Sequence, residues 1–176
     1  CQGWEADDVI GTVGRICSNN AWQCVIVTGD RDSLQLIDDN VNVKLVISKP
    51  GQTNATLYDR AQFEAEYGFE PKKLIDLKAL MGDASDNIPG VAGVGPKTAK
   101  ELLLKFGSLD GVYANLDNPS VRPKLREKLE AGKDNAYLSY ELATIIPEAP
   151  IDFAPEDALL QPYHKQELYQ LFQRLE

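Results

Sequence analysis

The sequence predicts an α/β domain followed by a helical subdomain, and three observations support this fold class. Residues 5–18 place apolar side chains at the spacing of an amphipathic helix. Residues 24–27 form a short β-branched run, which is typical of a strand buried on both faces of a parallel sheet. From residue 59 onward the periodic segments have the helical period. We therefore expect a partial parallel-type sheet flanked by helices, and then an α-helical part.

The segments that complete the α/β part follow in chain order: a short helix over 33–38, a strand over 41–47, a turn at Pro50-Gly51 and a returning strand over 54–57. Two helices come next, over 59–67 and 72–81. Gly68 and Gly82 end them, because glycine accepts the left-handed conformation that closes many helices.

The second half of the chain is mostly helical around a glycine-rich run at 90–95. Residues 124–145 predict one long helix with a weak point at Gly132. Residues 147–162 hold four prolines and indicate a linker or strap, and 164–176 form a terminal helix. The predicted divisions are 1–80 for the α/β core, 81–146 for the helical subdomain, and 147–176 for the linker and last helix.

Composition excludes several kinds of protein. No apolar run approaches the roughly 18 residues of a membrane span, so we expect no membrane partner. Three cysteines without a CxxC pair favour a reduced, cytoplasmic compartment. A single histidine, His164, leaves almost nothing for a Ser-His-Asp or histidine-rich metal mechanism. The formal net charge of −9 argues against a DNA-binding protein on bulk charge alone, but many of these acids are clustered.

Acidic residues gather in three motifs, Glu5-Ala6-Asp7-Asp8, Gly29-Asp30-Arg31-Asp32 and Gly82-Asp83-Ala84-Ser85-Asp86. Each motif alone is better explained by helix capping or a turn than by metal binding. Together they indicate a metal site, since Asp30 follows a buried strand and ligands gather at the carboxyl ends of such strands. Oxygen ligands without histidine favour Mg²⁺ or Mn²⁺. The candidate ligands are Glu5, Asp7, Asp8, Asp30, Asp32, Asp83 and Asp86.

Asp7 fits this metal site less well than its neighbours. On an ideal helix it points about 200° from Glu5, whereas Glu5 and Asp8 share one helix edge. Three explanations stay open: the helix starts later, Asp7 acts through water, or Asp7 is structural.

The glycine-rich run leads into a helix that starts near Pro96. Free N–H groups at a helix start form an anion site that fits a phosphate, and nearby lysines add positive charge. A P-loop is excluded because G-x-x-x-x-G-K-[ST] is absent from the sequence. A plain helix–loop–helix with a glycine turn is the alternative. The candidate DNA-binding residues are Gly90, Gly93, Val94, Gly95, Lys97, Thr98 and Lys100.

In order and rough spacing, these motifs resemble those of the 5′→3′ exonuclease domain of bacterial DNA polymerase I, in the flap endonuclease or 5′-nuclease family. The resemblance covers roughly residues 3–146. It implies a PIN-like core, a helix–hairpin–helix, and two-metal-ion hydrolysis of DNA in replication and repair. Asp8, Asp30 and Asp32 would be catalytic, and main-chain carbonyls near Gly93 and Val94 would hold K⁺.

The same resemblance implies the partners: 5′ flap, nicked or 5′-ended duplex DNA, and a polymerase body joined to the chain, with activity at the bacterial nucleoid. In that family a strand bearing another metal-binding aspartate, and a basic helical arch, precede the first acidic motif. This sequence opens at Cys1 just before that motif. We therefore expect a chain that lacks its N-terminal part and is impaired in cleavage.

Two other functions stay open at this point. One is a non-catalytic helix–hairpin–helix module that binds DNA, in which the acids are caps or relics. The other is a phosphatase-like enzyme built on the D-x-D of Asp30 and Asp32, which would need a matched lysine further along the chain.

Overall fold

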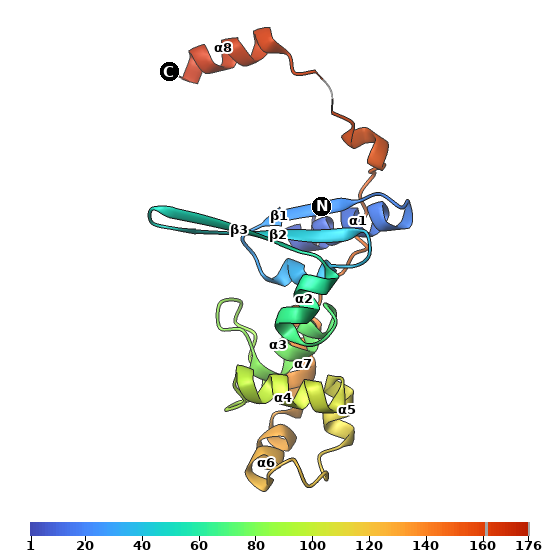
Figure 1. The fold of residues 1–176 in the computed structure, drawn as a ribbon, viewed down its shortest axis with the longest axis vertical. Coiled ribbons are helices and arrows are strands. Elements are labelled where there is room, and N and C mark those ends of the chain that lie inside the picture. The colour runs from blue at the N-terminus through green and yellow to red at the C-terminus, as the bar shows by residue number, and fades with distance from the viewer. Residues whose placement is uncertain (161, 176) are drawn as a thin grey trace.

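The computed structural model describes residues 1–160 and 162–175. Its packed body has an α/β part at one end and a helical part at the other, and the C-terminal segment extends beyond the α/β part (Figure 1). Helix α1 (Ala6–Asn19) comes first and is followed by strand β1 (Cys24–Thr28). The 3₁₀ helix η1 (Asp32–Leu36) then leads to the strands β2 (Val41–Lys49) and β3 (Gln52–Tyr58). This order confirms the predicted fold class.

In the described part of the chain the three strands form one sheet in the order β1-β2-β3. β1 runs parallel to β2, with Cys24 opposite Val41 and Thr28 opposite Leu45. β2 and β3 form an antiparallel hairpin that turns at Gly51, where φ is +79°. The predicted turn is confirmed, since glycine permits this positive φ. β3 is longer than expected.

β1 corrects one expectation, since it is not buried on both faces. Ile26 is buried, but Val25 and Val27 are 51% and 66% exposed. α1 and η1 pack on one side of the sheet, and β1 is its edge strand. The apolar run predicted the strand correctly, but it could not show which faces other elements cover.

The helical part is built around α3, most of whose side chains are buried. Its helices are α2 (Arg60–Tyr67), α3 (Lys73–Met81), α4 (Pro96–Phe106), α5 (Leu109–Ala114), α6 (Pro123–Ala131) and α7 (Lys133–Ala143). α3 contacts α7, α4 and η1, so it joins the helical part to the α/β part. Leu80 and Phe63 are fully buried at this centre. Helix α5 was not predicted.

The predicted long helix over 124–145 is wrong as a single element. It breaks at Gly132, where φ is −98° and ψ is 9°, into α6 and α7. A Cβ added at Gly132 would lie 2.9 Å from a methyl group of Val91. The glycine therefore allows a close approach to the glycine-rich loop as well as the break.

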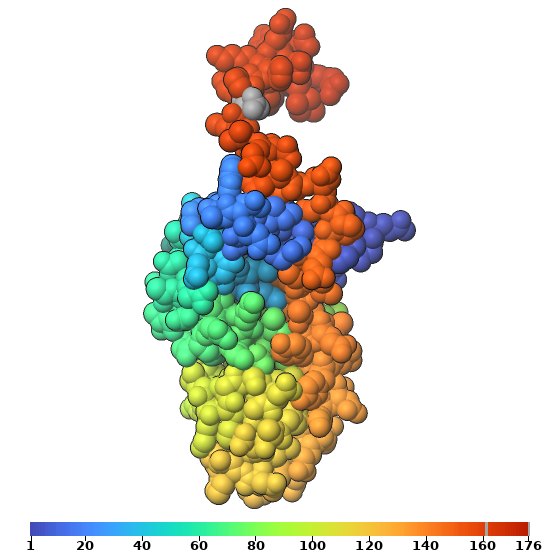
Figure 2. Space-filling model, turned by 90° about the vertical axis from the view of Figure 1, so that its right-hand side faces the viewer, coloured from blue at the N-terminus to red at the C-terminus, as the bar shows by residue number. Residues whose placement is uncertain are grey.

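The first residues of the predicted linker belong to the packed body. Arg15 Nε donates a hydrogen bond to the Pro147 carbonyl at 2.6 Å, and Ala149 N donates to Thr12 Oγ1 at 2.8 Å. Figure 2 shows this segment, in orange, beside the blue N-terminal helix. The 3₁₀ helix η2 (Pro155–Ala158) and helix α8 (Lys165–Leu175) follow, and the described residues of α8 are all exposed.

Helix α8 confirms the predicted terminal helix as far as Leu175, and residue 176 lies outside the described residues. None of the helices in residues 1–160 and 162–175 combines the length and apolar character needed to cross a membrane.

Candidate metal centre

An open hollow of about 630 Å³ lies at the carboxyl end of β1, and we call it the acidic hollow. Its lining residues are Thr28, Gly29, Asp30, Arg31, Asp32, Asp83, Ser85 and Asp86. Directly after the strand, Asp30 N donates to Thr28 Oγ1 at 3.0 Å and Asp32 N donates to Asp30 Oδ1 at 2.9 Å. These bonds turn the chain at the strand end. The second and third acidic motifs meet there, since residues of both line the hollow.

Three aspartates approach closely in the hollow, and we call them the aspartate triad: Asp32, Asp83 and Asp86. One carboxylate oxygen from each lies within 4.8 Å of the others. Asp32 is half-buried at the start of η1, and Asp86 is exposed on the loop that follows α3. This spacing would allow one cation to be bound by all three.

The loop that carries Asp83 and Asp86 is closed by backbone hydrogen bonds. Asp83 N donates to the Ile88 carbonyl at 2.9 Å, and Ile88 N donates to the Asp83 carbonyl at 2.8 Å. Gly82 sits at φ +73° and Gly90 at φ +60° where the two arms meet. A Cβ at Gly90 would lie 2.2 Å from Gly82 N, so this close approach requires glycine.

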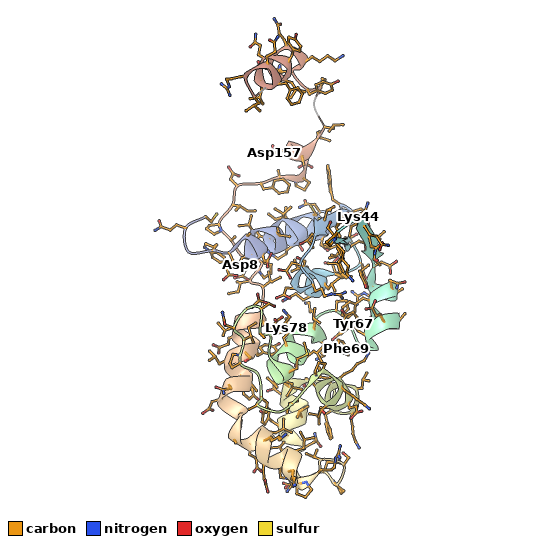
Figure 3. All side chains as sticks on the ribbon, turned by 90° about the vertical axis from the view of Figure 1, so that its left-hand side faces the viewer. Asp8, Lys44, Tyr67, Phe69, Lys78 and Asp157 are labelled. Carbon is orange, nitrogen blue, oxygen red and sulfur yellow. The ribbon has the colours of Figure 1, made fainter. Side chains whose placement is uncertain are left out.

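Lys78, from the last part of α3, ends inside the aspartate triad, and Figure 3 shows where it lies between the sheet and the helical part. It is 5% exposed. Its Nζ donates a hydrogen bond to Asp32 Oδ1 and forms ion pairs with Asp83 Oδ2 at 2.7 Å and Asp86 Oδ2 at 3.7 Å. One ammonium group thus contacts all three carboxylates.

These contacts act on the protonation of the triad. The hydrogen bond from Lys78, helped by bonds from Ser85, lowers the pKa of Asp83 to about 2. Burial raises the pKa of Asp32, against contacts with Lys78 that lower it. For Lys78, burial lowers the pKa, but its carboxylate partners outweigh this and leave it raised. The triad therefore favours a bound cation.

In the first acidic motif, Asp7 feels the charge of the hollow. Burial raises the pKa of Asp7, and so do the charges of Asp30 and Asp32. Helix α1 begins at Ala6, and Glu5 precedes it with extended backbone at φ −81° and ψ 163°. The ideal-helix angle between Glu5 and Asp7 therefore does not apply, and of the three explanations left open, the later helix start agrees with the structure.

Asp8 has a different environment, because both of its oxygens accept backbone hydrogen bonds. Glu5 N donates to Oδ2 at 3.1 Å, and Ile146 N donates to Oδ1 at 2.8 Å. Asp8 lies on α1 in Figure 3. In this conformation it caps α1 and holds the chain that follows α7. Of the seven candidate ligands, four line the hollow: Asp30, Asp32, Asp83 and Asp86.

The donor set passes one chemical test for a divalent ion. Clustered carboxylates are the ligands that hard divalent cations prefer, and a cluster with one lysine keeps an excess of negative charge. The residues therefore fit a divalent metal ion.

The glycine-rich loop lies between α3 and α4, and its two ends differ. Gly90 is buried, and its N–H donates to Ser139 Oγ at 2.9 Å; Val94 is 3% exposed. Both help to hold the loop against α3 and α7. Gly93, Gly95 and Lys97 are exposed, and Gly95 precedes the first residue of α4. The exposed end is the part of the loop that a phosphate could reach.

Two lysines near this loop already have partners. Lys100 Nζ donates to the Glu66 carbonyl at 3.1 Å. Lys128 Nζ, from α6, donates to the Gly93 carbonyl at 3.0 Å. Thr98 is half-buried in the first turn of α4. The Gly93 carbonyl therefore holds a side-chain ammonium at the place where K⁺ was expected.

Sequence reasoning missed Lys78. The available signal was a lysine among Leu77, Ala79 and Leu80 in a helix that ends just before an acidic motif. A buried lysine needs acidic partners, so its position in an apolar helix, together with the acids that follow, could have indicated the ion pairs.

Comparison with known proteins places this hollow in a family. A sequence profile described as “5'-3' exonuclease, N-terminal resolvase-like domain” matches residues 1–68. A second, described as “5'-3' exonuclease, C-terminal SAM fold”, matches residues 69–166. The chain belongs to the 5′-3′ exonuclease family. This family is a group of nucleases, and the two profiles together cover most of the chain. They meet at 68/69, and our boundary at 80/81 stays a prediction.

Among curated members of the 5′-3′ exonuclease family, the DNA polymerase I of Caldicellulosiruptor bescii is 46% identical over 175 residues. That match covers 99% of this chain and 20% of the relative. The DNA polymerase I of Bacillus subtilis is 40% identical over 98% of this chain and 19% of its own length. The chain thus spans about a fifth of the length of these relatives.

Two solved structures share the fold. A T5 5′-exonuclease structure with divalent metal ions (zinc) bound has a TM-score of 0.68 at 24% identity, over 84% of this chain and 52% of that one. The catalytic core of Rad2 in complex with DNA substrate has a TM-score of 0.54 at 21% identity, over 84% and 50%. At these identities the two structures support the architecture, and they do not assign residues.

Proposed function

We propose that this chain is the 5′→3′ exonuclease and flap endonuclease part of a DNA polymerase I, and that it hydrolyses DNA phosphodiesters in replication and repair. The observation that carries the proposal is the convergence of the second and third acidic motifs on the hollow at the end of β1. Family membership supports the nuclease chemistry, and the DNA polymerase I relatives support attachment to a polymerase body.

Two groups of carboxylates would hold two divalent ions, Mg²⁺ or Mn²⁺. Asp7 and Asp30, whose charges interact, would hold one ion, and the aspartate triad would hold the other. Glu5 stands next to Asp7, and Asp8 would join the site if it released Ile146 N. When bound, such ions supply an activated water and stabilise the charge on the leaving oxygen. The carboxylates position the ions, so no histidine is needed as a base.

The start of α4 would bind the DNA backbone. The first N–H groups of a helix lack intrahelical partners and favour a phosphate. Lys97 is exposed there, and Gly93 and Gly95 leave the backbone accessible. We propose that the loop and α4 act as a helix–hairpin–helix that grips duplex DNA with a 5′ flap, a nick or a 5′ end. K⁺ would reach the Gly93 carbonyl when Lys128 turns away.

The test is Mg²⁺-dependent cleavage of a 5′-flap DNA by the native sequence and by Asp30→Asn. We expect a flap product that needs both the metal and Asp30, because Asp30 lines the hollow at the end of β1. A duplex-binding measurement on the same two proteins accompanies the assay. If the native sequence binds DNA but Asp30→Asn cleaves equally well, the hollow is not the active site.

Two observations are compatible with the alternative functions, a non-catalytic DNA-binding module and a phosphatase-like enzyme. Asp8 acts as a backbone cap, as expected of a non-catalytic DNA-binding module. Lys78 contacts Asp32 of the D-x-D, as expected of a phosphatase-like site. DNA binding without metal-dependent cleavage would favour the first alternative, and hydrolysis of a phosphomonoester would favour the second. Family membership favours the nuclease over both. The cytoplasmic location stays a prediction.

A further inference from the structure

Lys78 is a cation placed where a metal ion would be expected. It contacts Asp32, Asp83 and Asp86, which lie on two segments of the chain about fifty residues apart. Its side chain is 6% exposed, so solvent does little to screen these contacts. A buried ammonium and buried carboxylates each need a partner of opposite charge, and here they provide it for each other.

The ammonium and a divalent ion would compete for the same oxygens. A Mg²⁺ ion demands oxygen ligands at about 2.1 Å in nearly octahedral geometry. The triad oxygens lie within 4.8 Å of one another, and Asp83 Oδ2 already lies 2.7 Å from Lys78 Nζ. An ion bound by all three carboxylates would therefore stand against the ammonium, and the two positive charges would repel each other.

We propose that Lys78 is an internal counter-ion that holds the aspartate triad together in the metal-free protein and yields its carboxylates to a divalent ion when that ion binds. Lys78 is a positioning residue in this account. A second ion held by Asp7 and Asp30 would meet no such lysine, since neither aspartate has an ion pair among the described residues. The two ions should therefore load unequally, with the ion at Asp7 and Asp30 binding more tightly. This inference rests on the proposed metal site.

The experiment is a Mn²⁺ titration of the chain, with free Mn²⁺ measured by electron paramagnetic resonance. The native sequence should show a tighter and a weaker class of sites. Lys78→Met should tighten the weaker class by about tenfold, because a positive charge in contact with the site is removed. Lys73→Met is the matched control: it lies on the same helix and pairs with Asp76. It should leave both classes unchanged.

A purely structural role for Lys78 predicts a different result, since disordering the triad would weaken Mn²⁺ binding. If Lys78→Met binds Mn²⁺ no more tightly than the native sequence, the counter-ion proposal is overturned. If Asp30→Asn loses Mn²⁺ binding in the same experiment, the proposed function still stands. If neither the native sequence nor Asp30→Asn binds Mn²⁺, the metal site itself fails.

A second measurement needs no substitution at Lys78, in case Lys78→Met does not fold. The side-chain ammonium resonances of the native chain are followed by NMR while Mg²⁺ is added. The Lys78 resonance should move in step with filling of the weaker site, while the Lys73 resonance stays in place. A Lys78 resonance that does not move at saturating Mg²⁺ contradicts the exchange of cations.

Discussion

The acidic hollow and the glycine-rich loop are two candidate binding sites that differ in the groups they offer to a ligand. The hollow is made of side chains: four carboxylates line it and one buried lysine contacts three of them. The loop offers mainly backbone, with exposed glycines and the first N–H groups of α4. A site of side chains is lost when one atom changes, whereas a backbone site tolerates most substitutions. The two regions should therefore differ sharply in their response to mutation.

The largest expected effect is at the hollow. Asp83→Asn should lower Mg²⁺-dependent flap cleavage by about 100-fold or more, because a metal contributes several kcal/mol to charge stabilisation. Duplex binding should stay within about twofold, since the first turn of α4 is untouched. Asp117→Asn is the control, because this aspartate is 99% exposed and pairs with Arg126. Equal cleavage by all three proteins would remove the triad from the mechanism.

The next effect connects the two regions through α3. Leu80 is fully buried, and its carbonyl accepts a hydrogen bond from Val91 N of the glycine-rich loop. Leu80→Ala should lower the free energy of unfolding by about 2–5 kcal/mol, as measured by urea denaturation. Leu104→Ala, at a side chain that is 55% exposed, should cost under about 1 kcal/mol. Similar losses for both variants would mean that α3 is not the shared support.

A smaller effect is expected at the loop. Lys97→Glu should weaken binding to all duplexes by a similar factor, because phosphate contacts carry no sequence information. The slope of log K against log salt should fall by about 1 for each phosphate that the protein no longer neutralises. Lys49→Glu, at the end of β2, makes the same charge change elsewhere. A loss of affinity that depends on the DNA sequence, or an equal loss in the control, would contradict backbone binding.

The smallest effect concerns the cation at the loop. Lys128 contacts the Gly93 carbonyl, so duplex binding by the native chain should change by less than about twofold when KCl replaces LiCl at equal ionic strength. Lys128→Met frees that carbonyl and should make K⁺ the favoured salt. Fluorescence anisotropy with a labelled duplex measures both. A strong preference for K⁺ in the native chain would show that the lysine does not replace the ion.

Sequence reasoning recovered much of the hollow for a physical reason. Asp30 and Asp32 follow a strand, and Asp83 and Asp86 follow a helix stop; both are local signals. What it missed depends on packing between segments. Lys78 is buried because α3 lies against η1. Asp8 accepts a hydrogen bond from Ile146 N, which is 138 residues away in the sequence. Neither contact produces a periodic pattern in the sequence from which it could be predicted.

The fold shows the same division. A β-branched run predicted β1, alternation and a Pro-Gly turn predicted β2 and β3, and glycine stops predicted the ends of α2 and α3. The break at Gly132 was marked as a weak point, but the close approach of Val91, which leaves no room for a Cβ there, could not be predicted. The exposed face of β1 could not be predicted. An apolar run indicates which side chains can be buried, but it does not indicate whether another element covers them.

The hydrogen bond between Ala149 N and Thr12 has a practical consequence for where the folded body ends. Proline content alone would set that end at residue 146, which would remove both this bond and the hydrogen bond from Arg15 to Pro147. A protease acting on the native chain should instead cut beyond Ala149, among exposed residues such as Leu159 and Leu160. A shortened protein for crystallisation should therefore keep residues 147–150, and it can omit α8 without disturbing the core, because the described residues of that helix are exposed.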